Sequence, residues 1–408
     1  MKIAIIGCGA SGMTAAISAI RNGAGSESIT IYEACDRPGR KILATGNGRC
    51  NLGNECLEKS SFYTSDGNGD EFLSYLIHTF SVDDLKKFFE SLGVITCSKN
   101  GYIYPRSMQS STVLNALIRE CNDAGVCIRY SSPVSDIKRS GKGLILTVGG
   151  KEERADRVIV ASGFGSGGFL PKDTDVTELL KGLGIHVKKP LPALCGLKTS
   201  DKKITAAGVR AAGKVTLLSE DGILGFDEGE IQFTKETVSG IPVFQISRLA
   251  SVNLSKGKKV YALLDMMTER SYGEIVSVIR RIASMYPERS VLSVLEGILN
   301  NKLAMLVLER SQIPAEKKAS DLKDVQAEKI VHNIKELRFE ITGTEAFEKA
   351  QTMCGGVPVG EIDKNCSLKS DENIFITGEL LDIDGKCGGY NLYLAWATGL
   401  IAGRSAVK

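Results

Sequence analysis

A glycine-rich segment near the amino terminus has the residue types and spacing that bind pyrophosphate. It reads Gly7-Cys8-Gly9-Ala10-Ser11-Gly12 and directly follows the apolar run 3–6, which we expect to be a buried strand. Gly7 permits a tight turn, Gly9 lets the backbone approach phosphate oxygens, and Gly12 lets the following helix pack close to the strand. That helix, expected over about residues 11–22, would point its unpaired N–H groups at the anion.

A carboxylate lies at the distance along the chain where the ribose of a dinucleotide needs an acceptor. The second expected strand, 29–32, ends in Glu33, which is 21 positions beyond Gly12. An acid at such a spacing accepts the ribose 2′-hydroxyl, and its charge repels a 2′-phosphate, so NADP is not expected at this site. The glycines alone would be weak evidence. Strand, glycines, helix, strand and acid in this order predict a βαβ dinucleotide-binding unit.

Two further glycine-rich segments are expected to approach the cofactor. The segment Gly46-Asn47-Gly48-Arg49-Cys50-Asn51 follows a basic stretch that contains Arg40 and Lys41, and it could run its backbone beside a large flat cofactor. The segment 162–168 follows an expected buried strand at 157–161. We interpret it as a cofactor-contact turn, because no strand and acid of the right length come after it. The segments 7–12 and 46–51 together predict a dinucleotide enzyme of the flavoprotein class.

The composition excludes several classes of protein. Hydrophobic residues make up 43% and charged residues 24%, which is ordinary for a globular protein, and 408 residues allow two or three domains. A net charge of +3 gives little support for a nucleic-acid partner. No apolar run approaches the roughly 18 residues of a membrane span. Eleven cysteines without a CxxC pair or a secretory signal predict a cytoplasmic protein, and three distant histidines predict no metal site.

The order of the expected elements indicates a discontinuous α/β domain with a second domain inserted in it. Helices are expected between about 69 and 92 and from a cap at Ser110 or Ser111 to about 124, with a hairpin turning at 99–101. Strands recur at 126–130, 137–139 and 144–148. From Pro190 the chain has a β-rich part (190–268) and then a helical part (269–332). A strand over 373–377 and a helix to about 407 complete the first domain, so we predict a cofactor domain of 1–189 and 345–408 and an inserted substrate domain of 190–344.

Two long motifs make the sequence resemble a known family. Residues 39–51 (GRKILATGNGRCN) and 378–391 (GELLDIDGKCGGYN) resemble the YhiN-like bacterial FAD-dependent flavoproteins, which include BaiN-type bile-acid dehydro-reductases and enzymes described as aminoacetone oxidases. The resemblance spans nearly the whole chain. It implies a Rossmann-like FAD domain similar to that of glutathione reductase, with an inserted substrate domain. The sequence departs from the family pattern at 352–354 and at Lys235-Glu236.

The resemblance also implies the cofactor contacts, position by position. It places Gly7, Gly9, Ala10, Ser11 and Gly12 at the pyrophosphate, Glu33 and Ala34 at the adenosine ribose, Arg40 and Lys41 near phosphate or flavin, and Thr45, Gly46, Asn47, Gly48, Cys50 and Asn51 along the isoalloxazine ring. It places the backbone of Val134 at the adenine, Ala161, Ser162 and Gly163 over the adenosine side, and Gly378, Glu379, Asp384, Gly388, Gly389, Tyr390 and Asn391 in the flavin pocket.

Arg49 and Tyr390 are the candidates for catalysis. Arg49 could stabilise an anionic reduced flavin or bind a carboxylate of the substrate. Tyr390 could donate a proton or form a wall beside the ring, and the sequence does not separate these roles. Cys50 could act as a redox partner, but packing is the favoured interpretation because only Cys56 is near it in the sequence.

Two other groups of polar residues have both a functional and a structural interpretation. Asp382 and Asp384 could bind ribityl hydroxyls, or they could be turn-forming acids on the surface. In the inserted domain, Gln232, Lys235 and Glu236 are candidate substrate contacts, with an exposed strand end as the favoured alternative.

These inferences predict an FAD-dependent oxidoreductase that acts on a small organic substrate. A hydride would pass between flavin N5 and the substrate, while the protein orients the reactants and controls access of oxygen. NAD(P)H as a transient electron donor and oxygen as an electron acceptor both stay open, because no separate nicotinamide-binding unit is visible. An RNA-modifying flavoprotein and a non-catalytic FAD-stabilised binding protein are the alternatives from other classes, and the oligomeric state is unknown.

Overall fold

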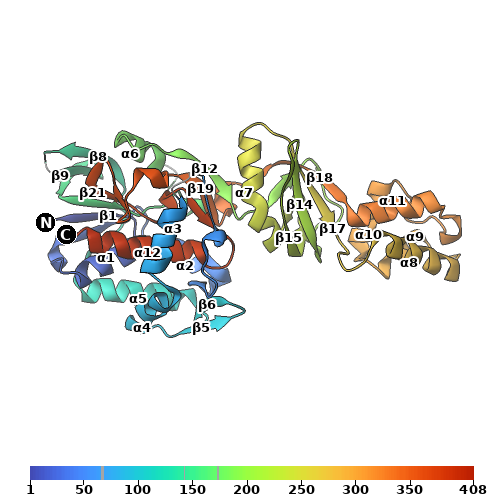
Figure 1. The fold of residues 1–408 in the computed structure, drawn as a ribbon, viewed down its shortest axis with the longest axis horizontal. Coiled ribbons are helices and arrows are strands. Elements are labelled where there is room, and N and C mark those ends of the chain that lie inside the picture. The colour runs from blue at the N-terminus through green and yellow to red at the C-terminus, as the bar shows by residue number, and fades with distance from the viewer. Residues whose placement is uncertain (66–68, 142, 172–173) are drawn as a thin grey trace. The chain divides into compact units, whose positions relative to one another are not determined.

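The chain folds into two compact units. The computed structural model describes residues 1–65, 69–141, 143–171 and 174–408. One unit combines Met1–Leu191 with Phe347–Lys408, and the other comprises Pro192–Ala346 (Figure 1). Each unit has a hydrophobic core of its own. The amino- and carboxyl-terminal segments therefore share one core, although the second unit lies between them in the sequence.

A mainly parallel sheet forms the centre of the first unit. Its strand order is β20-β21-β11-β1-β2-β7, in which β20 runs antiparallel to β21 and the other neighbours are parallel. All four residues of β1 are buried, as in parallel strands that are covered on both faces. The strands are β1 (Ile3–Ile6), β2 (Ile29–Tyr32), β7 (Cys127–Arg129), β11 (Arg157–Val160), β20 (Ser367–Leu368) and β21 (Asp371–Ile376).

This strand order defines where a ligand can bind. The chain passes from β1 through α1 (Ala10–Arg21) to β2 on one side, whereas β11 lies on the other side of β1. In open α/β sheets, ligands bind where the order reverses in this way, outside the carboxyl ends of the strands. Gly7, Glu33, Ala161 and Thr377 directly follow β1, β2, β11 and β21, so they share this edge of the sheet.

Helices and a smaller sheet cover the two faces of the central sheet. Helices α1, α5 (Ser110–Asp123) and α12 (Tyr390–Ser405) lie on one face, and the antiparallel sheet of β8, β9 and β10 lies on the other (Figure 1). Close packing of α1 and α12 depends on small residues. A β-carbon on Gly399 or Gly403 of α12 would overlap backbone atoms of Ser11 or Ala15 in α1.

The predicted hairpin and helices of the first unit are present, and several short elements that were not predicted lie between them. The hairpin of β5 (Thr96–Lys99) and β6 (Tyr102–Pro105) turns at Asn100 and Gly101, which both have positive φ. The expected serine cap is wrong, because Gln109 occupies the cap position of α5 and the Ser110 hydroxyl donates to the Leu43 carbonyl at 3.0 Å. The other elements are α2 (Arg40–Ala44), β3 (Gly53–Asn54), β4 (Phe62–Thr64), α3 (Gly69–Thr79), α4 (Val82–Ser91), β8 (Val134–Ser140), β9 (Gly143–Val148), β10 (Lys151–Ala155), α6 (Val176–Gly182), β12 (Lys188–Ala193), β19 (Thr352–Gly356) and β22 (Ile383–Gly385).

A closed six-stranded barrel forms the centre of the second unit. Its order is β13-β16-β15-β14-β17-β18, and α7 packs against its strands. Alternate residues of β17 face the core, namely Val260, Ala262 and Leu264. Four helices come between β17 and β18 in the sequence, and no strand was predicted at the position of β18. The elements are β13 (Leu197–Thr199), β14 (Arg210–Ser219), β15 (Gly222–Phe233), β16 (Thr237–Ser239), α7 (Ile241–Ser255), β17 (Val260–Asp265), α8 (Tyr272–Met285), α9 (Val291–Glu296), α10 (Asn301–Ser311), α11 (Asp324–Lys335) and β18 (Leu337–Thr344).

Candidate functional site

All residues predicted to contact the cofactor lie in the first unit. The glycine turn, residues 7–12, connects β1 to α1. Gly7 has a φ of +101°, and a β-carbon on it would lie 2.7 Å from the Ser162 Cα atom. A β-carbon on Gly12 would overlap the Gly7 carbonyl oxygen, whereas one on Gly9 would have no atom within 4 Å. Packing therefore requires Gly7 and Gly12, and Gly9 leaves the backbone open to a ligand.

The carboxylate of Glu33 holds the glycine turn against the end of β2. Glu33 is 8% exposed and accepts hydrogen bonds from the Cys8 N–H at 2.7 Å and the Cys35 N–H at 2.8 Å. A carboxylate has about four acceptor positions, so others remain for a ribose hydroxyl. Ala34 follows it and is half-buried. Arg40, predicted near phosphate or flavin, contacts the Cys35 sulfur at 3.5 Å and so lies beside the turn that follows Glu33.

A buried hydroxyl next to the glycine turn has no hydrogen-bond partner within the described part of the chain. This atom is Oγ of Ser162, which lies with Ala161 just beyond β11. An unpaired buried hydroxyl costs about 1–3 kcal/mol, so a ligand that supplied a partner would stabilise the site. Gly163 has a φ of +64°, and Val134 is buried at the start of β8. Together with the free N–H groups at the start of α1, this edge fits the pyrophosphate and adenosine of a dinucleotide.

An ion pair joins the basic stretch to the segment after β21. The Lys41 ammonium contacts the Glu379 carboxylate and the Ser166 hydroxyl. The same carboxylate accepts hydrogen bonds from the Ser166 hydroxyl at 2.7 Å and from the Phe164 N–H at 3.3 Å. Lys41 was predicted to lie near phosphate or flavin, and the structure shows that Glu379 compensates its charge. Ser166 was not predicted individually, although its glycine-rich segment was.

The glycine loop, residues 45–51, has an unusual backbone. Gly46, Asn47, Gly48 and Cys50 have φ between +54° and +80°. Asn47 and Cys50 are the notable cases, because residues with a β-carbon seldom adopt the left-handed region. The Cys50 N–H donates to the Thr45 carbonyl at 3.0 Å and closes the loop. This geometry exposes a stretch of backbone that no regular helix or strand would present.

Two side chains of the glycine loop have very different environments. Cys50 is fully buried, and burial raises the pKa of its thiol to about 12, which keeps it protonated at neutral pH and favours packing over a redox role. Arg49 is half-buried. Its Nε donates to the Gly46 carbonyl at 3.0 Å, and its guanidinium carbon lies 5.5 Å from the centroid of the Tyr104 ring. Its terminal nitrogens bond to no other described residue.

The tail turn, residues 385–391, is held by two asparagines. The Asn391 side chain accepts a hydrogen bond from the Gly385 N–H at 2.8 Å and donates to the Gly385 carbonyl at 2.9 Å. With its amide oriented to satisfy both groups, Asn51 donates to the Gly53 carbonyl at 2.8 Å and accepts from the Gly389 N–H at 3.3 Å. The structure therefore brings the glycine loop and the tail turn together.

The hydroxyl and carboxylates near the tail turn are committed to protein contacts. The Tyr390 hydroxyl donates to the Cys56 carbonyl at 3.0 Å, and burial raises the pKa of this phenol. Asp382 is 1% exposed and accepts from the Lys188 ammonium at 2.9 Å. Asp384 is 2% exposed. The alternative interpretation of these aspartates as turn-forming acids on the surface is therefore wrong.

The candidate substrate residues of the second unit lie at the end of a barrel strand. Gln232 pairs through its backbone with Arg210 and Ser239. Lys235 and Glu236 are exposed in the turn between β15 and β16. This arrangement matches the exposed strand end that was the alternative interpretation.

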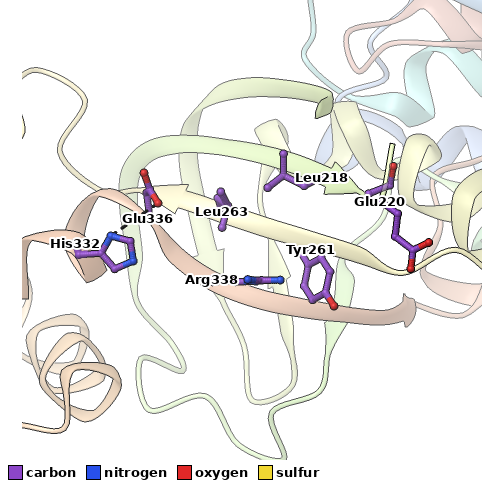
Figure 2. Close-up of a pocket in the computed structure, with 8 residues that line it drawn as sticks. Leu218, Glu220, Tyr261, Leu263, His332, Glu336 and Arg338 are labelled. Carbon is purple, nitrogen blue, oxygen red and sulfur yellow. Dashed lines mark ion pairs between the residues drawn. The ribbon is translucent and has the colours of Figure 1, made fainter. Parts of the chain in front are cut away.

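A hollow on the outer face of the barrel lies apart from the residues predicted from the sequence (Figure 2). Its volume is about 410 Å³. The Arg338 guanidinium carbon lies 4.0 Å from the centroid of the Tyr261 ring, and His332 lies 3.8 Å from the Glu336 carboxylate. No predicted site residue lines this hollow, whose walls are formed by Leu218, Ser219, Glu220, Tyr261, Leu263, His332, Glu336 and Arg338.

The polar clusters and helices of the described residues bear on metal binding and on membrane insertion. In the part of the chain that the structure describes, no three His, Cys, Asp or Glu side chains gather as metal ligands would. None of the described helices combines the length and apolar character needed to cross a membrane. All eleven cysteines are free thiols.

A family model and two relatives match this chain along nearly its whole length. Residues 1–405 match the family model described as HI0933-like protein Rossmann domain. The 3-dehydro-bile acid delta(4,6)-reductase of Clostridium scindens is 38% identical over 409 residues, which cover 100% of this chain and 99% of that protein. The ribosomal RNA dihydrouridine synthase of Escherichia coli is 25% identical over 410 residues, which cover 97% and 95%. Among solved structures, the 3-ketosteroid-delta4-(5alpha)-dehydrogenase of Rhodococcus jostii RHA1 covers 100% of this chain and 96% of its own, at 16% identity and a TM-score of 0.47.

Proposed function

Because the chain belongs to the HI0933-like family and its predicted cofactor residues gather in one unit, we propose that it is an FAD-dependent reductase of a small organic substrate. Its membership confirms the resemblance to the YhiN-like flavoproteins and the predicted Rossmann-like fold. The protein is accordingly a flavoprotein oxidoreductase.

The observation that carries the proposal is the buried, unpaired hydroxyl of Ser162 beside the glycine turn. In the proposed site, this hydroxyl and the N–H groups at the start of α1 bind the pyrophosphate, and Glu33 accepts a ribose hydroxyl. The glycine loop and the tail turn, which Asn51 joins through a hydrogen bond to Gly389, border the ring in this site. FAD, when bound, supplies a ring that can accept and return a hydride.

The names of two relatives support a reduction. One is a delta(4,6)-reductase, and the other is a dihydrouridine synthase, whose product differs from uridine by two added hydrogen atoms. Both names describe the addition of hydrogen to a substrate. For this chain we infer a substrate with a carbon–carbon double bond conjugated to a carbonyl group, and NAD(P)H as the source of electrons. The higher identity to the first relative favours a small molecule.

Arg49 has the geometry of a group that binds an anion or a carbonyl oxygen. Its Nε is used by the glycine loop, while its terminal nitrogens make no bond to another described residue. We assign it to the carbonyl oxygen of the substrate, where it stabilises the negative charge that develops as the double bond is reduced. Tyr390 is assigned to the wall of the site, because its hydroxyl already donates to Cys56.

A visible spectrum followed by an anaerobic titration tests the proposed function. We expect flavin absorption from the purified protein, bleaching by NADH or NADPH, and recovery of the colour when 2-cyclohexenone is added without oxygen. Bleaching by an amine or other small molecule with recovery only by oxygen would indicate an oxidase instead. A colourless protein that cannot be reconstituted with FAD would contradict the proposal.

Ribosomal RNA is a second candidate substrate, because the Escherichia coli relative covers nearly all of this chain. The net charge of +3 argues against it, since RNA binding draws on a large excess of cations. Incubation of the reduced protein with unmodified ribosomal RNA, followed by nucleoside analysis, separates the candidates. Formation of dihydrouridine without turnover of any enone would favour RNA.

A further inference from the structure

Two tyrosines of the β5–β6 hairpin lie against the two segments that are proposed to border the flavin. In β6, Ile103 is fully buried and points to one face, while Tyr102 and Tyr104 share the opposite face. A β-carbon on Gly46 of the glycine loop would lie 3.6 Å from Tyr104 Cε1, and one on Gly388 of the tail turn would lie 2.8 Å from Tyr102 Cε1. The hairpin therefore adds two phenols to the site that the sequence did not indicate.

Tyr104 differs from the other buried tyrosines because its hydroxyl has no hydrogen-bond partner among the described residues. The hydroxyl of Tyr32 donates to Glu153, that of Tyr390 to Cys56, and that of Tyr393 to Phe80. Tyr104 is 7% exposed, and its hydroxyl makes no hydrogen bond to a described residue, yet it is not among the enclosed unpaired atoms. A buried ring with an accessible, uncommitted hydroxyl is suited to meet a ligand.

The electrostatic surroundings of Tyr104 suit an acid that gives up its proton transiently. Burial raises the pKa of the phenol, while Arg49 opposes this rise, so the residue is protonated at neutral pH. The Arg49 guanidinium lies over the ring, at 5.5 Å from its centroid. A cation in this position stabilises a phenolate relative to a phenol.

We propose that Tyr104 is a catalytic residue, which donates the proton to the substrate during reduction. The inference rests on the proposed function. The conjugated double bond gains a hydride at its β-carbon, with both electrons ultimately supplied by NAD(P)H. It gains a proton at its α-carbon when the O–H bond of Tyr104 breaks, and water then returns a proton to the phenolate. Arg49 holds the carbonyl oxygen of the same substrate. The glycine loop therefore supplies the cation, and the β5–β6 hairpin supplies the proton donor.

The test separates the two halves of the reaction in Tyr104→Phe. Reduction of the flavin by NADH or NADPH and its later oxidation by 2-cyclohexenone are each followed by anaerobic rapid mixing. We expect Tyr104→Phe to slow the oxidation by about 100-fold, the scale of general-acid catalysis, and to leave the reduction rate and FAD content unchanged. Tyr286→Phe is the control, because it makes the same substitution at an exposed tyrosine of the second unit. Its rates of flavin reduction and oxidation should match those of the wild type.

Several outcomes would overturn the assignment. A rate of flavin oxidation in Tyr104→Phe within about 3-fold of the wild-type rate would overturn it, because loss of a general acid slows the reaction much more than this. A loss in Tyr102→Phe that equals or exceeds that in Tyr104→Phe would also do so, because it would indicate hairpin packing. If wild-type reduced protein is not oxidised by any enone, the proposed function itself fails and the assignment fails with it.

Two further measurements do not depend on the turnover of Tyr104→Phe. Tyr104→His should restore oxidation by the enone as the pH falls through about 6.5, because a protonated imidazole can donate a proton, whereas a purely structural role predicts no such dependence. In the proposed site Tyr104 lies beside the glycine loop that borders the flavin, so removal of its quenching phenol in Tyr104→Phe should raise the bound-flavin fluorescence. Unchanged fluorescence would place the ring away from the flavin and overturn the assignment.

Discussion

Lys41 and Glu379 form an ion pair that is partly shielded from water. Their side chains are 39% and 13% exposed, and Ser166 contacts both of them. A lysine in a phosphate-binding region would ordinarily be assigned to the anion. Here the carboxylate neutralises it, so the positive charge at the proposed pyrophosphate comes mainly from the N–H groups of α1. The pair also joins α2 to the segment after β21.

Removing both partners of this pair should cost less than the two single removals added together. Lys41→Met leaves the more buried carboxylate without its cation, and we expect it to lower the free energy of unfolding by about 1–2 kcal/mol. Glu379→Gln leaves a lysine that can reach water, so its cost should be below about 1 kcal/mol. The double variant should cost less than the sum of the single variants.

Urea unfolding of the FAD-free protein measures these effects. Trp396 is the single tryptophan and is fully buried in the first unit, so its fluorescence reports on that unit alone. Strictly additive costs would show that the two side chains do not interact in solution.

At the scale of the elements, the glycine turn does two separate jobs. Gly12 lets α1 approach the end of β1, because any β-carbon there would meet the Gly7 carbonyl oxygen. A β-carbon on Gly9 would have no atom within 4 Å, so packing does not require its small size, and in the proposed site this space lies beside the phosphate. The same segment thus joins a strand to a helix and leaves a place for phosphate.

Alanine substitutions should separate these two jobs. Gly12→Ala should displace α1 and lower the free energy of unfolding by about 1–3 kcal/mol, with loss of FAD. Gly9→Ala has a permitted backbone conformation and free space, so it should keep the stability of the wild type and weaken FAD binding alone. Urea titration through Trp396 and a fluorescence titration with FAD measure the two effects. Wild-type affinity in Gly9→Ala would place the pyrophosphate elsewhere.

The whole molecule consists of two units with separate hydrophobic cores. The residues proposed to hold FAD belong to the first unit, and the barrel and helices of the second unit pack on a core of their own.

The second unit should therefore fold without the first. We expect the segment Pro192–Ala346, produced alone, to unfold cooperatively on heating and to bind no flavin. Circular dichroism during a thermal scan tests the folding, and absorption near 450 nm after incubation with FAD tests the binding. A chain without a cooperative transition would show that the barrel depends on the first unit, and flavin in it would contradict the proposed location of the site.

Local features of the sequence were sufficient to predict several elements. The glycine turn, the hairpin at Asn100-Gly101 and the acid at the end of β2 depend on neighbouring residues, because turn chemistry and hydrophobic periodicity act over a few positions. The family resemblance extended this to the Rossmann-like fold and the flavin. The strand β18 was missed because it follows a long helical part and returns to the barrel, which only pairing with β17 and β13 defines.

Local sequence patterns are therefore sufficient to predict a dinucleotide-binding βαβ unit, whereas long-range packing determines which polar groups are left free. Lys41 and Glu379 are 338 positions apart, and Tyr390 and Cys56 are 334 apart, so no local pattern could show that each is engaged by the other. Among the buried tyrosines of the described residues, Tyr104 is the one whose hydroxyl bonds to no other described residue, and only the folded structure shows this. Hydrogen bonds between segments that are distant in the sequence form when folding packs these segments into the same core. This long-range packing determines which side chains remain available for chemistry.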